Sequence, residues 1–161
     1  MKTPLIALAA FLVFGQRYSG PQSQFGGLQL LEGYTAKRQS AVDATAWIIE
    51  GKTGVRVTFE AGPSEGSWAD PEERGKYAWY REQTMHGYLV RFALVKAGLK
   101  TQWEPESGRG LTPGNILLVT YLLGGPKSNH TANFAAKIAD SAELGDCLLM
   151  VATFDPSKGS F

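Results

Sequence analysis

The side chains that could act as catalytic groups in this sequence are few, and they fall in predicted turns. The chain of 161 residues holds two histidines and one cysteine. His86 stands before Gly87 at the tip of a predicted hairpin, and His130 lies in a loop rich in Gly, Pro, Ser and Asn. Nucleophilic catalysis needs a base that a third group orients, and both candidate bases fall in probable turns, where a polar loop residue is the simpler interpretation. The pattern therefore predicts no catalytic residue and a protein that is not an enzyme.

Metal binding is equally weakly indicated. A structural zinc site takes four Cys or His ligands, more than this chain offers. Glu65, Asp70, Glu72 and Glu73 could supply carboxylates for calcium, but they lack the Asp/Asn–Gly spacing of a calcium loop. We interpret them as a solvated acidic segment and expect neither a metal nor a cofactor.

One stretch matches a loose form of the phosphate-binding loop. Residues 46–53 read AWIIEGKT, with Ala in place of the first Gly. Such a loop needs flexible glycines and a following helix N-terminus, so that N–H groups and Lys meet the phosphates. Here the loop positions are rich in β-formers and the next residues, GVRVTFE, read as a strand. We therefore predict that this match is accidental.

Two tryptophans give the one hypothesis about a binding site. Trp68 and Trp103 each lie in a long predicted loop, flanked by acidic residues and Pro. Exposed aromatic side chains supply a large contact area at a low entropy cost, so both could line a shallow surface with Arg74 and Arg109 as polar partners. The alternative is that each Trp folds back over an open end of the core.

The elements that would position these residues are mostly strands. The runs TAWIIE and VRVTFE flank a Gly-bounded turn at 51–54 and predict a hairpin, with Ile48 facing Val57 and Ala46 facing Phe59. One side of this hairpin is apolar, because the residues alternate with a period of two.

A second hairpin is predicted around His86-Gly87. The two-residue turn places Glu82 opposite Arg91 as an exposed ion pair and Trp79 on the opposite face. We also expect Arg81 to lie on that apolar face and to snorkel or stack on a ring.

The remaining strands are predicted over 33–39, 116–123 and 132–138. ILLVTYLL at 116–123 has no alternation and indicates a central strand covered on both faces, although a buried helix fits as well.

A change of period then predicts a C-terminal helix. Asp140 or Ser141 can cap this helix; Asp140 with Glu143 resembles a capping box, and Pro156 is expected to stop the helix. A shorter helix followed by a strand over 149–154 is the alternative. The apolar residues that recur at three and four are Leu144, Cys147, Leu148, Val151 and Phe154. The fold class predicted is α+β: an antiparallel β-meander of about six or seven strands packed against one C-terminal α-helix. In a simple meander, the loops 62–76 and 98–114 share one rim of the sheet.

The N-terminal residues predict export. Lys2 precedes an apolar run over 5–14 that is too short to span a bilayer, which is typical of a signal peptide. We expect a signal peptide over 1–20, a flexible linker over 21–27, one domain over 28–156 and a tail over 157–161. A buried N-terminal helix is the alternative. The predicted location is secreted or periplasmic, with no stable membrane span after cleavage.

Composition narrows the class of partner. Sixteen basic and 15 acidic side chains give a formal net charge of +1, whereas nucleic-acid-binding proteins carry a basic excess that displaces counterions. We therefore expect no nucleic acid as partner. The charge balance does not determine the oligomeric state.

The layout of export signal, linker, WYRE-type strand at 79–82 and final amphipathic helix resembles small uncharacterised exported bacterial proteins. This resemblance implies shape alone and carries no functional residue. Two functions stay open. The first is a noncatalytic module that binds a protein or glycan through the rim loops 62–76 and 98–114. The second is a small hydrolase-type enzyme that uses loop carboxylates such as Glu65, Asp70 or Glu104.

Overall fold

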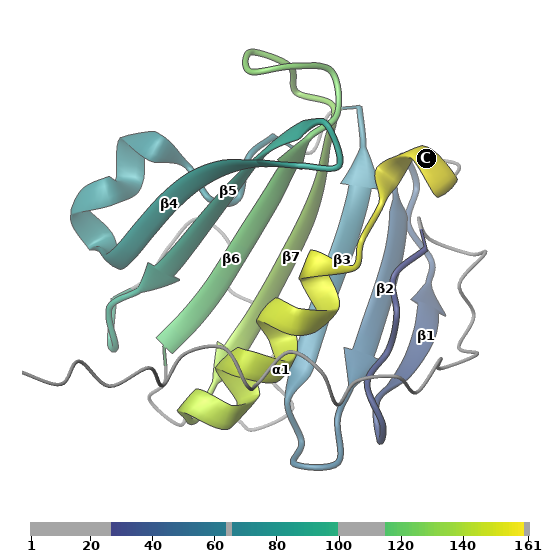
Figure 1. Cartoon of the computed structure of the whole chain (residues 1–161), viewed down its shortest axis with the longest axis vertical. Coiled ribbons are helices and arrows are strands. Elements are labelled where there is room, and N and C mark those ends of the chain that lie inside the picture. Colours follow the sequence, from purple (N-terminus) through teal and green to yellow (C-terminus); the bar gives the residue numbers. More distant parts are fainter. Residues whose placement is uncertain (1–26, 64–65, 100–114, 160–161) are drawn as a thin grey trace, which may run out of the picture.

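The fold is one antiparallel sheet of seven strands with a helix on one face, as a computed structural model shows for residues 27–63, 66–99 and 115–159 (Figure 1). The predicted α+β class is confirmed. The strands are β1 (Thr35–Gln39), β2 (Thr45–Glu50), β3 (Arg56–Gly62), β4 (Tyr77–Met85), β5 (Tyr88–Val95), β6 (Asn115–Leu122) and β7 (Thr131–Ile138). The helices are α1 (Ser141–Ala152) and two 3-10 turns, η1 (Pro71–Lys76) and η2 (Pro156–Lys158).

The order of the strands differs from a simple meander. It runs β1-β2-β3-β7-β6-β5-β4, so β3 pairs with β7, and β4 lies at the far edge. The chain must therefore cross the sheet between β3 and β4. Residues 66–76, which we name the crossing segment, make this passage over the face opposite α1. The prediction that loop 62–76 stays at a rim is wrong for this reason.

The second hairpin is confirmed from Trp79 to Met85, but a bulge before Trp79 shifts the register by one residue, so that Tyr77 and not Ala78 lies opposite Val95. Glu82 lies opposite Arg91, and Met85 lies opposite Tyr88 across the two-residue turn. His86 and Gly87 both have positive φ, at 51° and 84°, which is the conformation that lets such a turn follow the twist of the strands.

The first hairpin forms where expected, but its register is shifted by one residue. Glu50 lies opposite Arg56, and Ile48 lies opposite Thr58 instead of Val57. The loop takes five residues because Gly51 N–H bonds to the carbonyl of Val55, at 2.9 Å, and Val55 is fully buried. Since a strand, β3, follows Lys52 here, the run 46–53 has none of the helix geometry of a phosphate loop.

The prediction that Asp140 caps the C-terminal helix is confirmed. The Asp140 carboxylate accepts hydrogen bonds from the N–H groups of Ala142 and Glu143, at 2.9 Å each. Glu143 does not reach back to Asp140; its carboxylate accepts the N–H of Ala139 and the hydroxyl of Thr53. The helix ends at Ala152, and Pro156 begins η2 instead of ending α1.

The two faces of the sheet carry different cores. Under α1, on what we call the helix face, aromatic rings of Phe59, Phe134, Tyr121 and Phe154 pack against one another with centroids 4.8 to 6.3 Å apart. The opposite face, which we call the crossover face, carries a smaller apolar cluster that includes Trp68 of the crossing segment. Between these clusters all of β6 beyond its first residue is buried, as predicted for a central strand.

Candidate functional site

A row of polar side chains runs across the crossover face. Antiparallel register brings Glu60 of β3, Asn133 of β7, Thr120 of β6, Arg91 of β5 and Glu82 of β4 side by side. Residues paired in this way point to the same face of a sheet, with their Cβ atoms about 5 Å apart. The row therefore divides into a buried middle, at Asn133 and Thr120, and a more exposed end at β4 and β5.

The buried middle of the row fixes the start of the crossing segment. Thr120 Oγ1 accepts the N–H groups of Trp68 and Ala69, at 3.1 Å each, and donates to Asn133 Oδ1 at 2.7 Å. Trp68 N–H also reaches Asn133 Oδ1 at 3.2 Å. Buried backbone groups must find partners, and these two strand side chains supply them.

Asn133 uses its other side-chain atom in the same way. Asn133 Nδ2 donates to the carbonyl of Gly66 at 3.0 Å and to Thr131 Oγ1 at 2.9 Å, while the Thr131 hydroxyl donates to the same carbonyl at 2.7 Å. Thr120, Thr131 and Asn133 are all fully buried. The crossing segment is thus bonded to β6 and β7 at three successive points, Gly66, Trp68 and Ala69.

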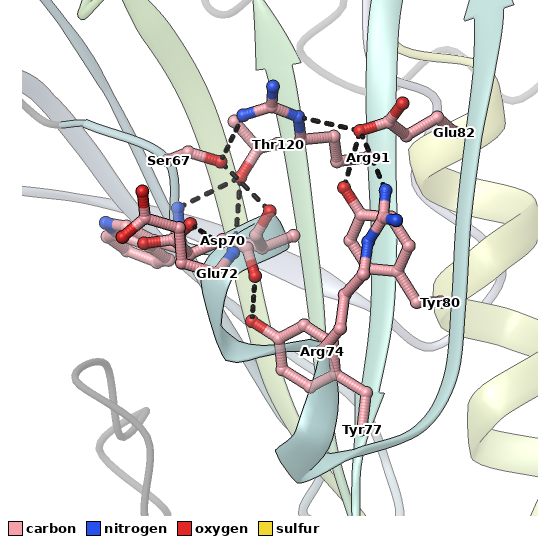
Figure 2. A network of polar contacts seen from close by, with 11 residues as sticks. Ser67, Asp70, Glu72, Arg74, Tyr77, Tyr80, Glu82, Arg91 and Thr120 are labelled. Carbon is pink, nitrogen blue, oxygen red and sulfur yellow. Dashed lines mark hydrogen bonds and ion pairs between the residues drawn. The ribbon is translucent and has the colours of Figure 1, made fainter.

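At the exposed end of the row, Glu82 and Arg91 meet Arg74, Tyr80 and the buried Tyr77. We name these five residues the surface cluster (Figure 2). Tyr80 Oη donates to Glu82 Oε1 at 2.6 Å, and Arg91 Nε lies 3.3 Å from the same oxygen. The Arg74 guanidinium lies 4.4 Å from the centre of the Tyr80 ring, and its Nη2 is 3.7 Å from Glu82 Oε1. Tyr77 stacks nearly parallel to Tyr80, with ring centres 5.8 Å apart.

The crossing segment places Arg74 in this cluster. Asp70 caps η1 by accepting the N–H of Glu72 at 2.9 Å, and Pro71 fills the first helical position, where a missing N–H is tolerated. The carbonyl of Asp70 accepts the hydroxyl of Tyr77 at 3.0 Å. Arg91 Nη1 also reaches Ser67 Oγ at 3.4 Å. Arg74 is therefore held by a short turn that is bonded to the sheet at both ends.

Electrostatics inside the surface cluster favours an ionised carboxylate. The hydrogen bond from Tyr80 lowers the pKa of Glu82, with Arg91 and Arg74 acting in the same direction and partial burial opposing them. Burial, then the hydrogen bond to Glu82, raises the pKa of Tyr80 to about 12. Burial and the nearby Glu73 raise the pKa of Tyr77 to about 12. At neutral pH Glu82 is thus negative and both tyrosines are neutral.

A shallow hollow of about 450 Å³ lies beside this cluster. The residues that line it are Asp70, Glu72, Glu73, Gly75 and Lys76. Glu73 pairs with Lys76, and Asp70 is occupied as the cap of η1. Two of its three acidic side chains therefore stabilise η1 itself.

The structure describes two of the four residues predicted for a binding surface. Trp68 is 3% exposed and packs in the small core of the crossover face, so it does not line an open surface; its burial matches the alternative in which the ring covers the core. Arg74 is exposed and lies in the surface cluster. Trp103 and Arg109, like the candidate carboxylates Glu65 and Glu104, lie outside the described residues.

Sequence reasoning missed the residues that organise this site. Thr120 stands alone as a polar residue among apolar ones in ILLVTYLL, and Asn133 lies in TANFAAKI. A single hydroxyl or amide in a buried strand must find a hydrogen-bond partner, and that requirement was the available signal. Cys147 is buried as predicted, and burial raises the pKa of its thiol to about 12, which keeps it protonated.

Comparison with protein-family models, curated proteins and solved structures finds no match for this chain. Within the described ranges, no helix has the length and apolar character needed to cross a membrane. The same residues contain no group of three His, Cys, Asp or Glu side chains placed to hold a metal ion. Function is therefore inferred from the side chains themselves.

Proposed function

We propose that this chain is an exported, noncatalytic module that binds a protein partner through the surface cluster. The observation that carries this proposal is the position of Arg74, whose side chain is 57% exposed while its guanidinium lies against Tyr80. Arg and Tyr are enriched where proteins bind one another, and a fixed guanidinium loses little conformational freedom on binding.

The same geometry favours a protein over a glycan. Sugar rings are held by flat aromatic faces that are open to solvent. On the crossover face Trp68 and Tyr77 are buried, and the guanidinium of Arg74 lies over the ring of Tyr80. What the cluster offers outward is a cation beside a carboxylate, a pattern that suits charged groups of a protein surface.

A noncatalytic role fits the state of the carboxylates. A general acid needs a pKa raised toward neutrality, and the pKa of Glu82 is lowered instead. Asp70, one of the carboxylates considered for a hydrolase, is bonded to the N–H of Glu72 as a helix cap. The carboxylates of Glu82 and Asp70 are therefore both engaged in contacts that stabilise the structure.

Binding is tested with the purified protein immobilised as bait against culture fluid and envelope extract. Arg74→Ala is expected to lose a protein that the unchanged chain retains, and Arg74→Lys to lose most of it, because Lys keeps the charge but not the planar stacking group. Arg38→Ala, at an exposed site on β1, is the matched control and should retain the protein. Equal retention by all four chains would refute the proposal.

Export has a separate test. Residues 1–27 fused to a reporter should carry it out of the cytoplasm, with cleavage before the domain that starts at Leu28. N-terminal sequencing of the exported product gives the cleavage point. A reporter that stays inside the cell removes the exported part of the proposal and leaves the binding part to the capture experiment.

A further inference from the structure

Strand β4 is the longer of the two strands at the edges of the sheet. It has nine residues, against five in β1, and pairs with β5 alone among the described strands (Figure 1). An edge strand carries N–H and C=O groups on its outer side that can pair with another strand. The edge at β4 is thus the larger strand-pairing surface of this sheet.

The hairpin register shows which backbone groups of β4 face outward. A two-residue turn is closed by a hydrogen-bonded pair, which here is Met85 with Tyr88. Hydrogen-bonded pairs then alternate along the antiparallel ladder as far as Trp79, before which a bulge shifts the register. The backbone groups of Arg81 and Gln83 therefore bond to β5, and those of Tyr80, Glu82 and Thr84 point away from the sheet.

Two side chains on this strand complement each other. Trp79 is 42% exposed on the helix face, beside Phe92, with ring centres 6.3 Å apart. Arg81 lies two residues further along, so it points to the same face and is also exposed. No described residue forms an ion pair with Arg81. A two-fold axis between these two residues would therefore place the aromatic ring of one copy beside the cation of the other.

We propose that two copies of this chain pair edge to edge through β4, antiparallel about a two-fold axis at Tyr80. A two-fold axis in the middle of β4 can fall at Tyr80, Arg81 or Glu82. At Arg81 it sets two guanidinium groups opposite each other, and at Glu82 two carboxylates, and like charges directly opposite destabilise a pair of strands. At Tyr80 it sets Trp79 of each copy opposite Arg81 of the other, which forms two cation–π contacts.

The other edge does not offer this match. Strand β1 reads TAKRQ, and its exposed Lys37 and Arg38 bring basic side chains together when two copies pair. Charged residues on an edge strand are a usual means of preventing such pairing. The asymmetry between the edges limits the assembly to a closed dimer and prevents an open fibre.

This inference goes beyond the proposed function and does not depend on it. In the dimer the two surface clusters lie next to each other on one continuous crossover face, because the side chains of Tyr80 and Glu82 point to that face. A short strand pairing buries less than a standard interface, so the dimer should form at micromolar concentration and above.

Disulfide trapping tests the register directly. The one natural cysteine, Cys147, is buried, so a new surface thiol reacts alone. Tyr80→Cys should give a covalent dimer under mild oxidation, since residues opposite each other have Cα atoms about 5.5 Å apart. Glu82→Cys is the matched control. It lies two residues from the axis, which separates the two thiols beyond bonding reach. Faster linking by Glu82→Cys overturns the proposed register.

The mass of the unmodified protein in solution tests the interface without a cysteine. Sedimentation equilibrium should show a dimer for the unchanged chain. The dissociation constant of the dimer should rise at least tenfold in Trp79→Ala and in Arg81→Glu. Arg38→Glu, at the β1 edge, should dissociate like the unchanged chain. A monomer at all concentrations, in a chain whose circular dichroism shows the folded sheet, rejects the dimer. Capture of a partner in the Arg74 experiment is scored separately, so each proposal fails on its own result.

Discussion

The two faces of the sheet are held by different forces. On the helix face, rings of Phe59, Phe134 and Phe154 pack with centroids 4.8 to 5.5 Å apart, and burial of apolar surface supplies the stability. On the crossover face, Thr120 and Asn133 bind the crossing segment through directed hydrogen bonds. Apolar burial is not directional, whereas a hydrogen bond constrains both the distance and the direction between its two groups. The second face is therefore the one that can hold a surface group such as Arg74 in place.

The largest effect is expected on the helix face. Phe154 is fully buried where α1 has ended, and its ring contacts Phe59, Tyr121 and Phe134. Phe154→Ala should lower the free energy of unfolding by about 3–5 kcal/mol, the usual cost of an aromatic cavity in a core. Urea titration followed by tryptophan fluorescence measures it. A loss below about 1 kcal/mol contradicts the assignment of this core.

The same isosteric substitution, Thr to Val, can be compared at two threonines of the crossover face. Thr120→Val removes the acceptor of two buried N–H groups, so stability should fall by about 1–3 kcal/mol. Thr58 Oγ1 is buried and has no hydrogen-bond partner among the residues that the structure describes. Thr58→Val should therefore leave stability unchanged or raise it by up to about 1 kcal/mol. The same change at two sites on one face thus has opposite expected signs, and chemical denaturation checks both.

Amide hydrogen exchange in the crossing segment is a second measurement that compares Thr120→Val with Thr58→Val. In Thr120→Val, amide hydrogen exchange should rise well above exchange in β6 and β7, most of all at Ala69, which loses its acceptor, and less at Trp68, which keeps its 3.2 Å contact to Asn133 Oδ1. In Thr58→Val the same amides should exchange as in the unchanged chain. Equal protection in both variants would show that packing, and not the Thr120 hydroxyl, holds the segment.

The sequence predicts the parts of this fold that depend on near neighbours. The hairpin at His86-Gly87 follows from its two-residue turn, and the start of α1 follows from Asp140, as the structure confirms. The first hairpin slips by one residue because Val55 is buried inside its loop, a preference of the core that the turn residues do not show.

The strand order and the polar row could not be predicted in this way. Glu60 meets Asn133 across 72 intervening residues, and local pattern carries no information on such a pairing. Thr120 and Asn133 meet for the same reason. Arg74 was predicted as a polar contact from its loop, but its stacking on Tyr80 depends on the crossover, which the predicted meander excluded.

A smaller effect on stability is expected when one tyrosine hydroxyl is removed from each face of the sheet. Tyr121 Oη donates to the carbonyl of Val151 at 2.9 Å inside the helix face, so Tyr121→Phe should cost about 1 kcal/mol. Tyr80→Phe removes the donor to Glu82 on a half-exposed site and should cost less than about 0.5 kcal/mol. Both variants keep the ring, so the difference in unfolding free energy reports the hydroxyl alone. A larger cost at Tyr80 would place the stronger bond on the surface cluster.

The smallest expected effect is the contribution of Glu82 to the stability of the fold at acidic pH. The pKa of Glu82 is lowered from its ordinary 4.5, first by the hydrogen bond from Tyr80. A carboxylate with a lowered pKa in the folded state adds stability above its ordinary pKa, and this contribution is lost as the pH falls through the lowered value. Stability should therefore decline below pH 4.5 less steeply in Glu82→Gln than in the unchanged chain, by a small amount because water screens this partly exposed site. Tyr80→Phe should raise the pKa of Glu82, which NMR titration of its side-chain carboxyl measures. An unchanged pKa in Tyr80→Phe would mean that Arg91 and Arg74, and not the tyrosine, hold Glu82 ionised, and the surface cluster would then rest on charge alone.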